Sequence, residues 1–188
     1  MIKKVGIVEK VGKVADADMK QLLQVAKQIK YEKNKPNNFF VLREVKHQVI
    51  SFVVNIQNIN EGFYVEDEKI YEQLVPILDR ITHTYDYPDK CYPRIMFARL
   101  PAGKRVYAHV DGASSTKHAH KLHIPIHTNP SVIFRVENKK MHFQKGFLYE
   151  VNNRKLHSTR NSGQTPRLHL IFEIARNLKK INKHITNV

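Results

Sequence analysis

The feature that most constrains the fold is the second half of the chain, where short apolar runs alternate with turn residues. Glycine, proline and asparagine separate these runs, at positions such as Gly103, Gly112 and Gly146. Short strands at this spacing are typical of a β-sandwich or a small barrel. Because the helical patterns come earlier in the chain, the sequence predicts an α+β protein, mainly β, whose β part carries the site. The predicted strands are Arg94–Leu100, Arg105–Val110, Lys121–His127, Val132–Val136, Lys140–Gln144, Phe147–Val151 and Leu168–Ile174.

The first half of the chain predicts two helices with a hairpin between them. One helix is expected from Asp16 or Asp18 to about Tyr31, with Asp16 as its N-cap. The other is expected over residues 66–85, where Pro76 should kink the helix or end its first part. The hairpin strands are expected over Phe39–Val45 and Gln48–Ile56.

Length and composition predict one soluble domain. The 188 residues divide into a helix and hairpin region over residues 1–90, a β core over residues 91–176 and a basic tail over residues 177–188. No stretch approaches the roughly 18 consecutive apolar residues of a membrane-spanning helix, and the basic N-terminus has no apolar signal core. The single cysteine, Cys91, cannot form an internal disulfide. We therefore expect a cytoplasmic protein with no membrane partner.

The charge balance is strongly basic. Thirty-two Lys and Arg residues against 17 Asp and Glu give a formal net charge of +15 and a sequence pI near 9.9. Such an excess favours polyanionic or acidic partners, including nucleic acid. The basic residues are spread over the whole chain, however, so a well-solvated surface explains the charge equally well.

The pair His109 and Asp111 is the first candidate for chemistry. On a strand, residues two apart point to the same face, so an imidazole and a carboxylate would converge there while Val110 turns away. His157 lies 46 residues after Asp111, beyond several predicted strands, and an antiparallel sandwich can return it to the pair. Two histidines and one carboxylate form a facial triad suited to Fe(II), which keeps three coordination positions open.

Arg167 follows His157 by ten residues and precedes the last predicted strand. Its forked guanidinium can bind a carboxylate through two hydrogen bonds. A metal with open positions beside a buried arginine is the arrangement that a chelating keto acid requires. Taken singly, Arg167 fits a surface arginine and His157 an ordinary loop or strand histidine. In this order and on this scaffold, they indicate a site.

These residues resemble the Fe(II)- and 2-oxoglutarate-dependent oxygenases, specifically the aspartyl/asparaginyl β-hydroxylase-like family that includes proline hydroxylases. The resemblance covers most of the C-terminal half. It is carried by Leu100-Pro101-Ala102-Gly103, His109-Val110-Asp111, Lys121-Leu122-His123-Ile124-Pro125-Ile126, and the run from Gly146 through His157, Asn161 and Arg167 to Ile174.

The resemblance implies a double-stranded β-helix, a jelly-roll or cupin-like core, flanked by the N-terminal helices. It implies that His109, Asp111 and His157 hold Fe(II) and that Arg167 binds the distal carboxylate of 2-oxoglutarate. It further implies that the enzyme uses O2, that ascorbate stimulates it, and that succinate and CO2 are the coproducts. The expected reaction is hydroxylation of a C–H bond in an amino-acid residue, of the peptidyl Asp/Asn or the proline type.

One stretch departs from the family pattern. Where the family has Arg-x-His, this sequence has Lys121-Leu122-His123. Strand parity places Lys121 and His123 on one face, opposite Leu122. We expect both to contact the cosubstrate. A lysine ammonium neutralises a carboxylate but, unlike a guanidinium, does not form two parallel hydrogen bonds with it.

Two further readings stay open at this point. The net charge favours a nucleic-acid or acidic-protein binding module on a degenerate jelly roll, or an oxygenase that acts on nucleic acid, although Trp is absent and no aromatic-rich recognition motif is present. The histidines from His118 to His127 are the basis for a zinc cupin, which also needs a glutamate shortly downstream. For His118 and His120 we favour a solvated loop, and for His142 and His169 ordinary strand positions.

Overall fold

The protein is a two-sheet jelly roll with helices on one side, seen in a computed structural model that describes residues 5–29, 50–58, 62–65, 67–112 and 117–176. The first run of the predicted hairpin, residues 39–45, and the basic tail, residues 177–188, lie outside this range. The described elements are β1 (Val8–Lys13), α1 (Asp16–Gln28), β2 (Ile50–Asn58), β3 (Gly62–Val65), α3 (Glu68–Ile81), β4 (Lys90–Leu100), β5 (Arg105–His109), β6 (His120–His127), β7 (Val132–Val136), β8 (Lys139–Met141), β9 (Phe147–Val151), β10 (His157–Asn161) and β11 (Arg167–Arg176).

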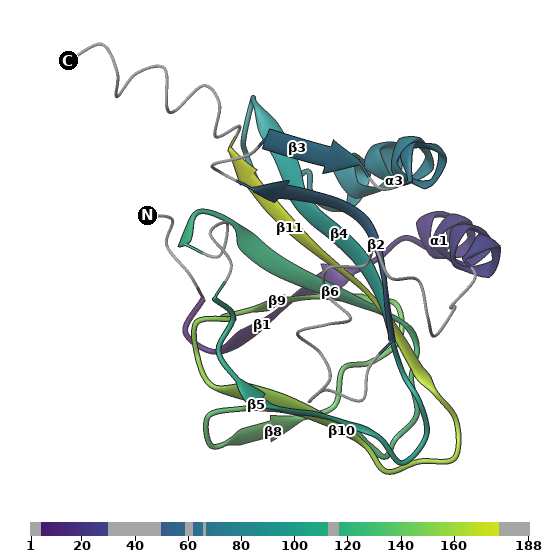
Figure 1. Ribbon diagram of the computed structural model, residues 1–188, viewed down its shortest axis with the longest axis vertical. Coiled ribbons are helices and arrows are strands. Elements are labelled where there is room, and N and C mark those ends of the chain that lie inside the picture. Colours follow the sequence, from purple (N-terminus) through teal and green to yellow (C-terminus); the bar gives the residue numbers. More distant parts are fainter. Residues whose placement is uncertain (1–4, 30–49, 59–61, 66, 113–116, 177–188) are drawn as a thin grey trace.

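The strands form one large and one small antiparallel sheet. The large sheet has the order β1-β9-β6-β11-β4-β2-β3, and the small sheet has the order β5-β10-β7-β8. Figure 1 shows α1 and α3 on one side of the large sheet and the small sheet on its other side. The jelly-roll core and the flanking N-terminal helices expected from the sequence are confirmed.

The helix-facing side of the large sheet holds the main apolar core. Leu170 and Phe172 of β11 are fully buried there together with Leu122 of β6, and they pack with Leu22 of α1 and Leu74 of α3. Burial of such side chains contributes about 1.5–3 kcal/mol each relative to exposure. An ion pair of 2.7 Å between Arg80 Nη2 and Asp18 Oδ1 also joins the two helices.

The space between the two sheets is lined differently. A small apolar cluster contains Phe134, Phe143 and Tyr149, and the rings of Phe143 and Tyr149 are stacked with their centroids 4.3 Å apart. The large sheet adds buried polar side chains to this interior from alternate positions of β6 and β11: Lys121, His123, Arg167, His169 and Glu173. Polar groups in a closed interior need partners or ligands, so this space is where a site is expected.

The strand predictions hold well, and the bounds of β7 and β9 agree with the sequence analysis. Three strands had no counterpart among the predicted runs: β1, β3 and β10. The second run of the expected hairpin corresponds to β2, which pairs with β3 and β4. No helix in the described parts of the chain has the length and apolarity needed to cross a membrane.

The helix predictions needed correction at their ends. Ala15, not Asp16, is the N-cap of α1, and no side chain caps it; the Asp16 carboxylate instead lies 3.1 Å from Lys13 Nζ. The second helix is shorter than expected, because α3 ends at Ile81. It also continues through Pro76, since the buried side chains on both sides of the proline keep the helix on the sheet.

Candidate metal centre

The three predicted metal ligands lie together in the space between the sheets. His109 ends β5 and His157 begins β10, and these two residues are paired directly across the strands. One ligand atom each from His109, Asp111 and His157 lies within 4.8 Å of the others. They form the one such group found among the described residues.

Asp111 reaches the histidines by a route that differs from the prediction. β5 ends at His109, so the alternation of a continuing strand does not place the carboxylate. Instead the backbone N–H of Asp111 donates to the carbonyl of Asn153 at 3.1 Å, which holds the chain against the turn before β10. Val110 turns outward, as expected, and is 51% exposed.

Both histidines are oriented by a backbone hydrogen bond. His109 Nδ1 lies 2.8 Å from the carbonyl of Tyr107, and His157 Nδ1 lies 2.8 Å from that of Lys155. A carbonyl only accepts, so each Nδ1 carries the proton and each Nε2 is left with a lone pair. The two Nε2 atoms lie 3.3 Å and 3.7 Å from Asp111 Oδ1. Such backbone bonds are how proteins orient metal-binding imidazoles.

The electrostatics keep His157 and Asp111 ready to bind a cation. Burial lowers the pKa of His157 to about 4, so its imidazole is neutral at pH 7. Burial raises the pKa of Asp111, but Lys121 and the neighbouring histidines outweigh it and hold that pKa well below its usual range. Burial also lowers the pKa of His109, yet its hydrogen bonds to Asp111 and to the Tyr107 carbonyl raise it overall.

The second oxygen of Asp111 is already bound by the protein. The Lys121 ammonium contacts Asp111 Oδ2, and Asn153 Nδ2 donates to the same oxygen at 3.1 Å. Oδ1 therefore remains as the oxygen that faces the two imidazoles. Lys121 was expected to contact the cosubstrate, whereas the structure places its ammonium on this carboxylate. Asn153 was not among the predicted site residues, because its role depends on the approach of Asp111.

Arg167 lies in the same interior. It begins β11 and is 2% exposed, and no described residue forms a hydrogen bond with its Nε atom. Burial lowers the pKa of this guanidinium to about 9. A buried guanidinium with an unsatisfied N–H favours an anionic ligand.

Two buried histidines accompany Arg167. His123 and His169 have ring centroids 5.9 Å apart. Within the described part of the chain, His123 Nδ1 and both ring nitrogens of His169 have no hydrogen-bond partner. Burial lowers the pKa of both rings well below the usual range, so both are neutral. His123 was predicted at the site from the resemblance. His169 was read as an ordinary strand residue, although its position two residues after Arg167 on β11 could have indicated the same face.

The histidine run gives no zinc site among the described residues. His120 is buried on β6, not in a solvated loop as predicted, and its Nδ1 lies 2.7 Å from Glu150 Oε1. Its Nε2 lies 2.8 Å from the hydroxyl of Tyr87, and the Tyr85 hydroxyl donates to Glu150 at 2.7 Å. These hydrogen bonds assign His120 a structural role. His118 is half-buried before β6.

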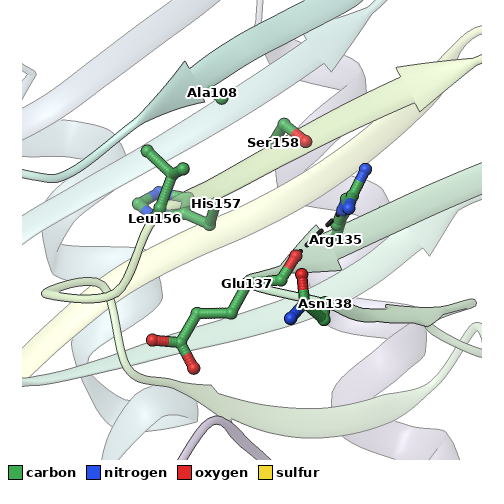
Figure 2. A pocket seen from close by; sticks show the side chains of 7 residues that line it. All are labelled: Ala108, Arg135, Glu137, Asn138, Leu156, His157 and Ser158. Atoms are coloured by element: carbon green, nitrogen blue, oxygen red, sulfur yellow. Dashed lines mark hydrogen bonds between the residues drawn. The ribbon is translucent and has the colours of Figure 1, made fainter.

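A cavity of about 730 Å³ lies next to His157 on the solvent-facing side of the small sheet. Figure 2 shows Arg135, Glu137 and Ser158 around it, and Arg135 Nε donates to the Glu137 carbonyl at 2.9 Å. The neighbouring Leu156 is 52% exposed. Of the predicted site residues, His157 alone lines this cavity.

Comparison with known proteins identifies similar families and folds. The model of one family, described as Aspartyl/Asparaginyl beta-hydroxylase, matches residues 59–177. A search of curated proteins finds no match. Among solved structures, an oxidoreductase of the 2OG-Fe(II) oxygenase family from Burkholderia pseudomallei is similar with a TM-score of 0.63 and 11% identity, covering 86% of this chain and 79% of that one.

Two prolyl hydroxylases share the fold as well. A viral collagen prolyl hydroxylase from Paramecium Bursaria Chlorella virus-1, solved as its 2OG complex, has a TM-score of 0.56 and 10% identity over 91% of this chain and 96% of that one. A prolyl hydroxylase from Trichoplax adhaerens, in complex with a hypoxia inducible factor peptide fragment, has a TM-score of 0.56 and 12% identity over 89% of this chain and 83% of that one.

Replacing Lys121 with methionine should destabilise the protein through Asp111. The variant leaves a buried carboxylate without its cation, and loss of one partner of a buried ion pair costs about 3–5 kcal/mol. Urea unfolding of the metal-free protein measures the loss. Lys155→Met is the matched control, because its ion pair with Glu137 is exposed and is worth at most about 1 kcal/mol. Equal stabilities of the two variants would contradict the assignment.

Acid should destabilise the metal-free protein well above the pH at which carboxylates titrate. Burial holds the pKa values of His123, His157 and His169 below 6.5, so unfolding takes up protons once the pH falls below about 6.5. The stability is complete above that pH and falls by roughly 1.4 kcal/mol per pH unit for each histidine. Urea unfolding at pH 7 and pH 5 tests this. His169→Leu should flatten the dependence, whereas exposed His83→Leu should not; a pH-independent midpoint would refute it.

Proposed function

The chain belongs to the aspartyl/asparaginyl beta-hydroxylase family, and from this premise we propose that it hydroxylates a C–H bond of an amino acid or amino-acid residue with Fe(II), 2-oxoglutarate and O2. It is thus an enzyme of the 2-oxoglutarate-dependent dioxygenase class. The observation that carries the proposal is the convergence of two imidazoles and one carboxylate oxygen beside a buried arginine whose Nε lacks a partner.

The residues present fit both the metal and the cosubstrate. His109, Asp111 and His157 offer two imidazole nitrogens and one anionic oxygen, which is the facial donor set of non-haem Fe(II) oxygenases. The Nε of Arg167, which has no hydrogen-bond partner among the described residues, fits a carboxylate of 2-oxoglutarate. When bound, Fe(II) would supply the chemistry by which O2 oxidises 2-oxoglutarate to succinate and CO2 and the substrate C–H bond to an alcohol.

Each residue has a distinct task in this proposal. The backbone carbonyls of Tyr107 and Lys155 keep Nε2 of the two histidines unprotonated and directed at the metal. Lys121 and Asn153 hold Oδ2 of the carboxylate, which leaves Oδ1 as a single, oriented ligand atom.

The cosubstrate is bound at two ends. Arg167 would hold the distal carboxylate of 2-oxoglutarate, and the Lys121 and His123 side chains would add positive charge and a hydrogen bond to the same ligand. The aromatic rings of Phe134 and Phe143, which contact His123, exclude water from this space. Ascorbate would stimulate the enzyme by keeping the metal ferrous.

The substrate belongs to the peptidyl Asp/Asn or the proline type, in line with the family. The nucleic-acid alternative depends on net charge alone and accounts neither for the three converging ligands nor for the buried arginine. It therefore ranks below the hydroxylase.

Removing a metal ligand should abolish turnover of 2-oxoglutarate. Asp111→Ala and His157→Ala should each lower succinate formation at least about a hundredfold, because each leaves only two ligands for the metal. Succinate is measured with Fe(II), ascorbate and 2-oxoglutarate. Asp86→Ala, an exposed carboxylate outside the site, is the matched control. Full activity in either ligand variant would overturn the proposal.

Arg167→Met should weaken cosubstrate binding without removing the metal site. Loss of two charge-assisted hydrogen bonds predicts an increase in the Kd for 2-oxoglutarate of at least about a hundredfold. Calorimetric titration of 2-oxoglutarate into the Mn(II)-loaded protein under anaerobic conditions measures this Kd. Arg160→Met, on an exposed position of β10, should leave it unchanged. An unchanged Kd in Arg167→Met would show that another cation binds the cosubstrate.

A further inference from the structure

Glu173 is a buried carboxylate to which the proposed reaction assigns no task. It lies on β11 and is 1% exposed, and neither of its carboxylate oxygens has a hydrogen-bond partner among the described residues. Buried charged groups are costly unless they are paired, and native proteins rarely leave them without partners. Glu173 therefore either balances the positive charge of neighbouring side chains or binds a cationic ligand.

The register of the large sheet places Glu173 opposite a residue that contacts the candidate metal centre. Its Cα is paired with that of Lys121 on β6 and with that of Arg94 on β4. Directly opposite side chains have Cβ atoms about 5 Å apart. The Lys121 ammonium contacts the proposed metal ligand Asp111. Glu173 therefore lies on the strand next to a residue that contacts the candidate metal centre.

Glu173 also lies at the opposite end of the interior from the cosubstrate arginine. Arg167 and Glu173 are on the same face of β11, six residues and about 20 Å apart along the strand. The Lys121 ammonium contacts Asp111, one of the proposed metal ligands, and Lys121 is paired with Glu173. Glu173 is thus at the end of β11 that pairs with this lysine, and Arg167, to which the distal carboxylate of the cosubstrate is assigned, is at the other end. A substrate group bound at Glu173 would therefore not compete with the cosubstrate for Arg167.

We propose that Glu173 binds a positively charged nitrogen of the substrate, and that the substrate is a free amino acid and not an internal residue of a polypeptide. The inference rests on the proposed hydroxylase function and names its substrate class. An ammonium group supplies the hydrogen bonds and the charge that the carboxylate lacks. An internal residue presents only neutral amides at its backbone nitrogen, which would leave the buried Glu173 carboxylate unpaired.

The same argument sets the expected selectivity. A site built to hydrogen-bond a substrate group rejects an analogue that lacks it, because the buried partner is left unsatisfied. A free amino acid should therefore stimulate succinate formation, and its N-acetylated form should not. Since one charge-assisted hydrogen bond corresponds to roughly a tenfold to hundredfold change in affinity, loss of the Glu173 charge should raise the KM by that factor.

The alternative is that Glu173 only balances the charges of Arg94 and Lys121. In that case Glu173→Gln would lower stability, yet would not change which compounds stimulate turnover. The preference for a free amine over its acetylated form therefore separates substrate binding from a structural role.

The experiment measures succinate formation with the standard L-amino acids and their N-acetylated forms, including Nα-acetyl-lysine, whose amine is on the side chain. Wild type, Glu173→Gln and the exposed control Glu72→Gln are compared. We expect stimulation by at least one free amino acid, a tenfold to hundredfold higher KM in Glu173→Gln with a smaller change in kcat, and wild-type behaviour in Glu72→Gln. Glu173→Asp, which keeps the charge, should recover part of the affinity.

A second measurement distinguishes loss of substrate affinity from misfolding of the Glu173→Gln variant. Calorimetry of the stimulating amino acid against the Mn(II)- and 2-oxoglutarate-loaded protein, without O2, should show the same loss of affinity, and urea unfolding reports whether Glu173→Gln is folded.

Three results would overturn the inference. They are equal stimulation by acetylated forms, an unchanged KM in a folded Glu173→Gln variant, and stimulation by Nα-acetyl-lysine or by peptides alone. In each, 2-oxoglutarate turnover by the wild type persists. Absence of 2-oxoglutarate binding by the wild type would instead refute the proposed function itself, and the inference with it.

Discussion

The alternation of side chains along β11 is the constraint on which the rest of the structure depends. Its residues from Leu168 to Ile174 at even positions are buried against the helices, while those from Arg167 to Glu173 at odd positions face the space between the sheets. The apolar face holds this central strand in register with β4 and β6. A slip of one residue would exchange the two sets and place the Arg167 guanidinium against the helices.

The polar interior that results is costly for the fold and suited to ligands. Its apolar cluster is small, and several charged or imidazole side chains beside it have atoms without a hydrogen-bond partner among the described residues. The contact between Lys121 and Asp111 neutralises one carboxylate, and the backbone carbonyls orient the two candidate ligand histidines. The groups left over are an arginine at one end and Glu173 near the metal centre. Ligands of opposite charge would complete both ends.

The strands that the sequence predicts best are those whose inward-facing side chains are apolar. β7 and β9 were found because their inward side chains are apolar and turn residues flank them. β10 was missed because its inward residues are His157, Thr159 and Asn161, so the strand has no apolar alternation. β1 was missed for a related reason, since this edge strand is largely exposed. β5, which carries His109, was predicted, whereas β10, which carries His157, was not.

The sequence by itself determined the two helices and most strands of the β core, the jelly-roll class through its resemblance, and the candidates His109, Asp111, His157 and Arg167. Only the tertiary structure decided that a turn, not strand alternation, brings Asp111 to the histidines, that Lys121 contacts this carboxylate, and that His120 is a buried structural residue. The physical reason is that these contacts depend on the cross-strand register between segments far apart in the chain. Local patterns of apolar and polar residues do not determine that register.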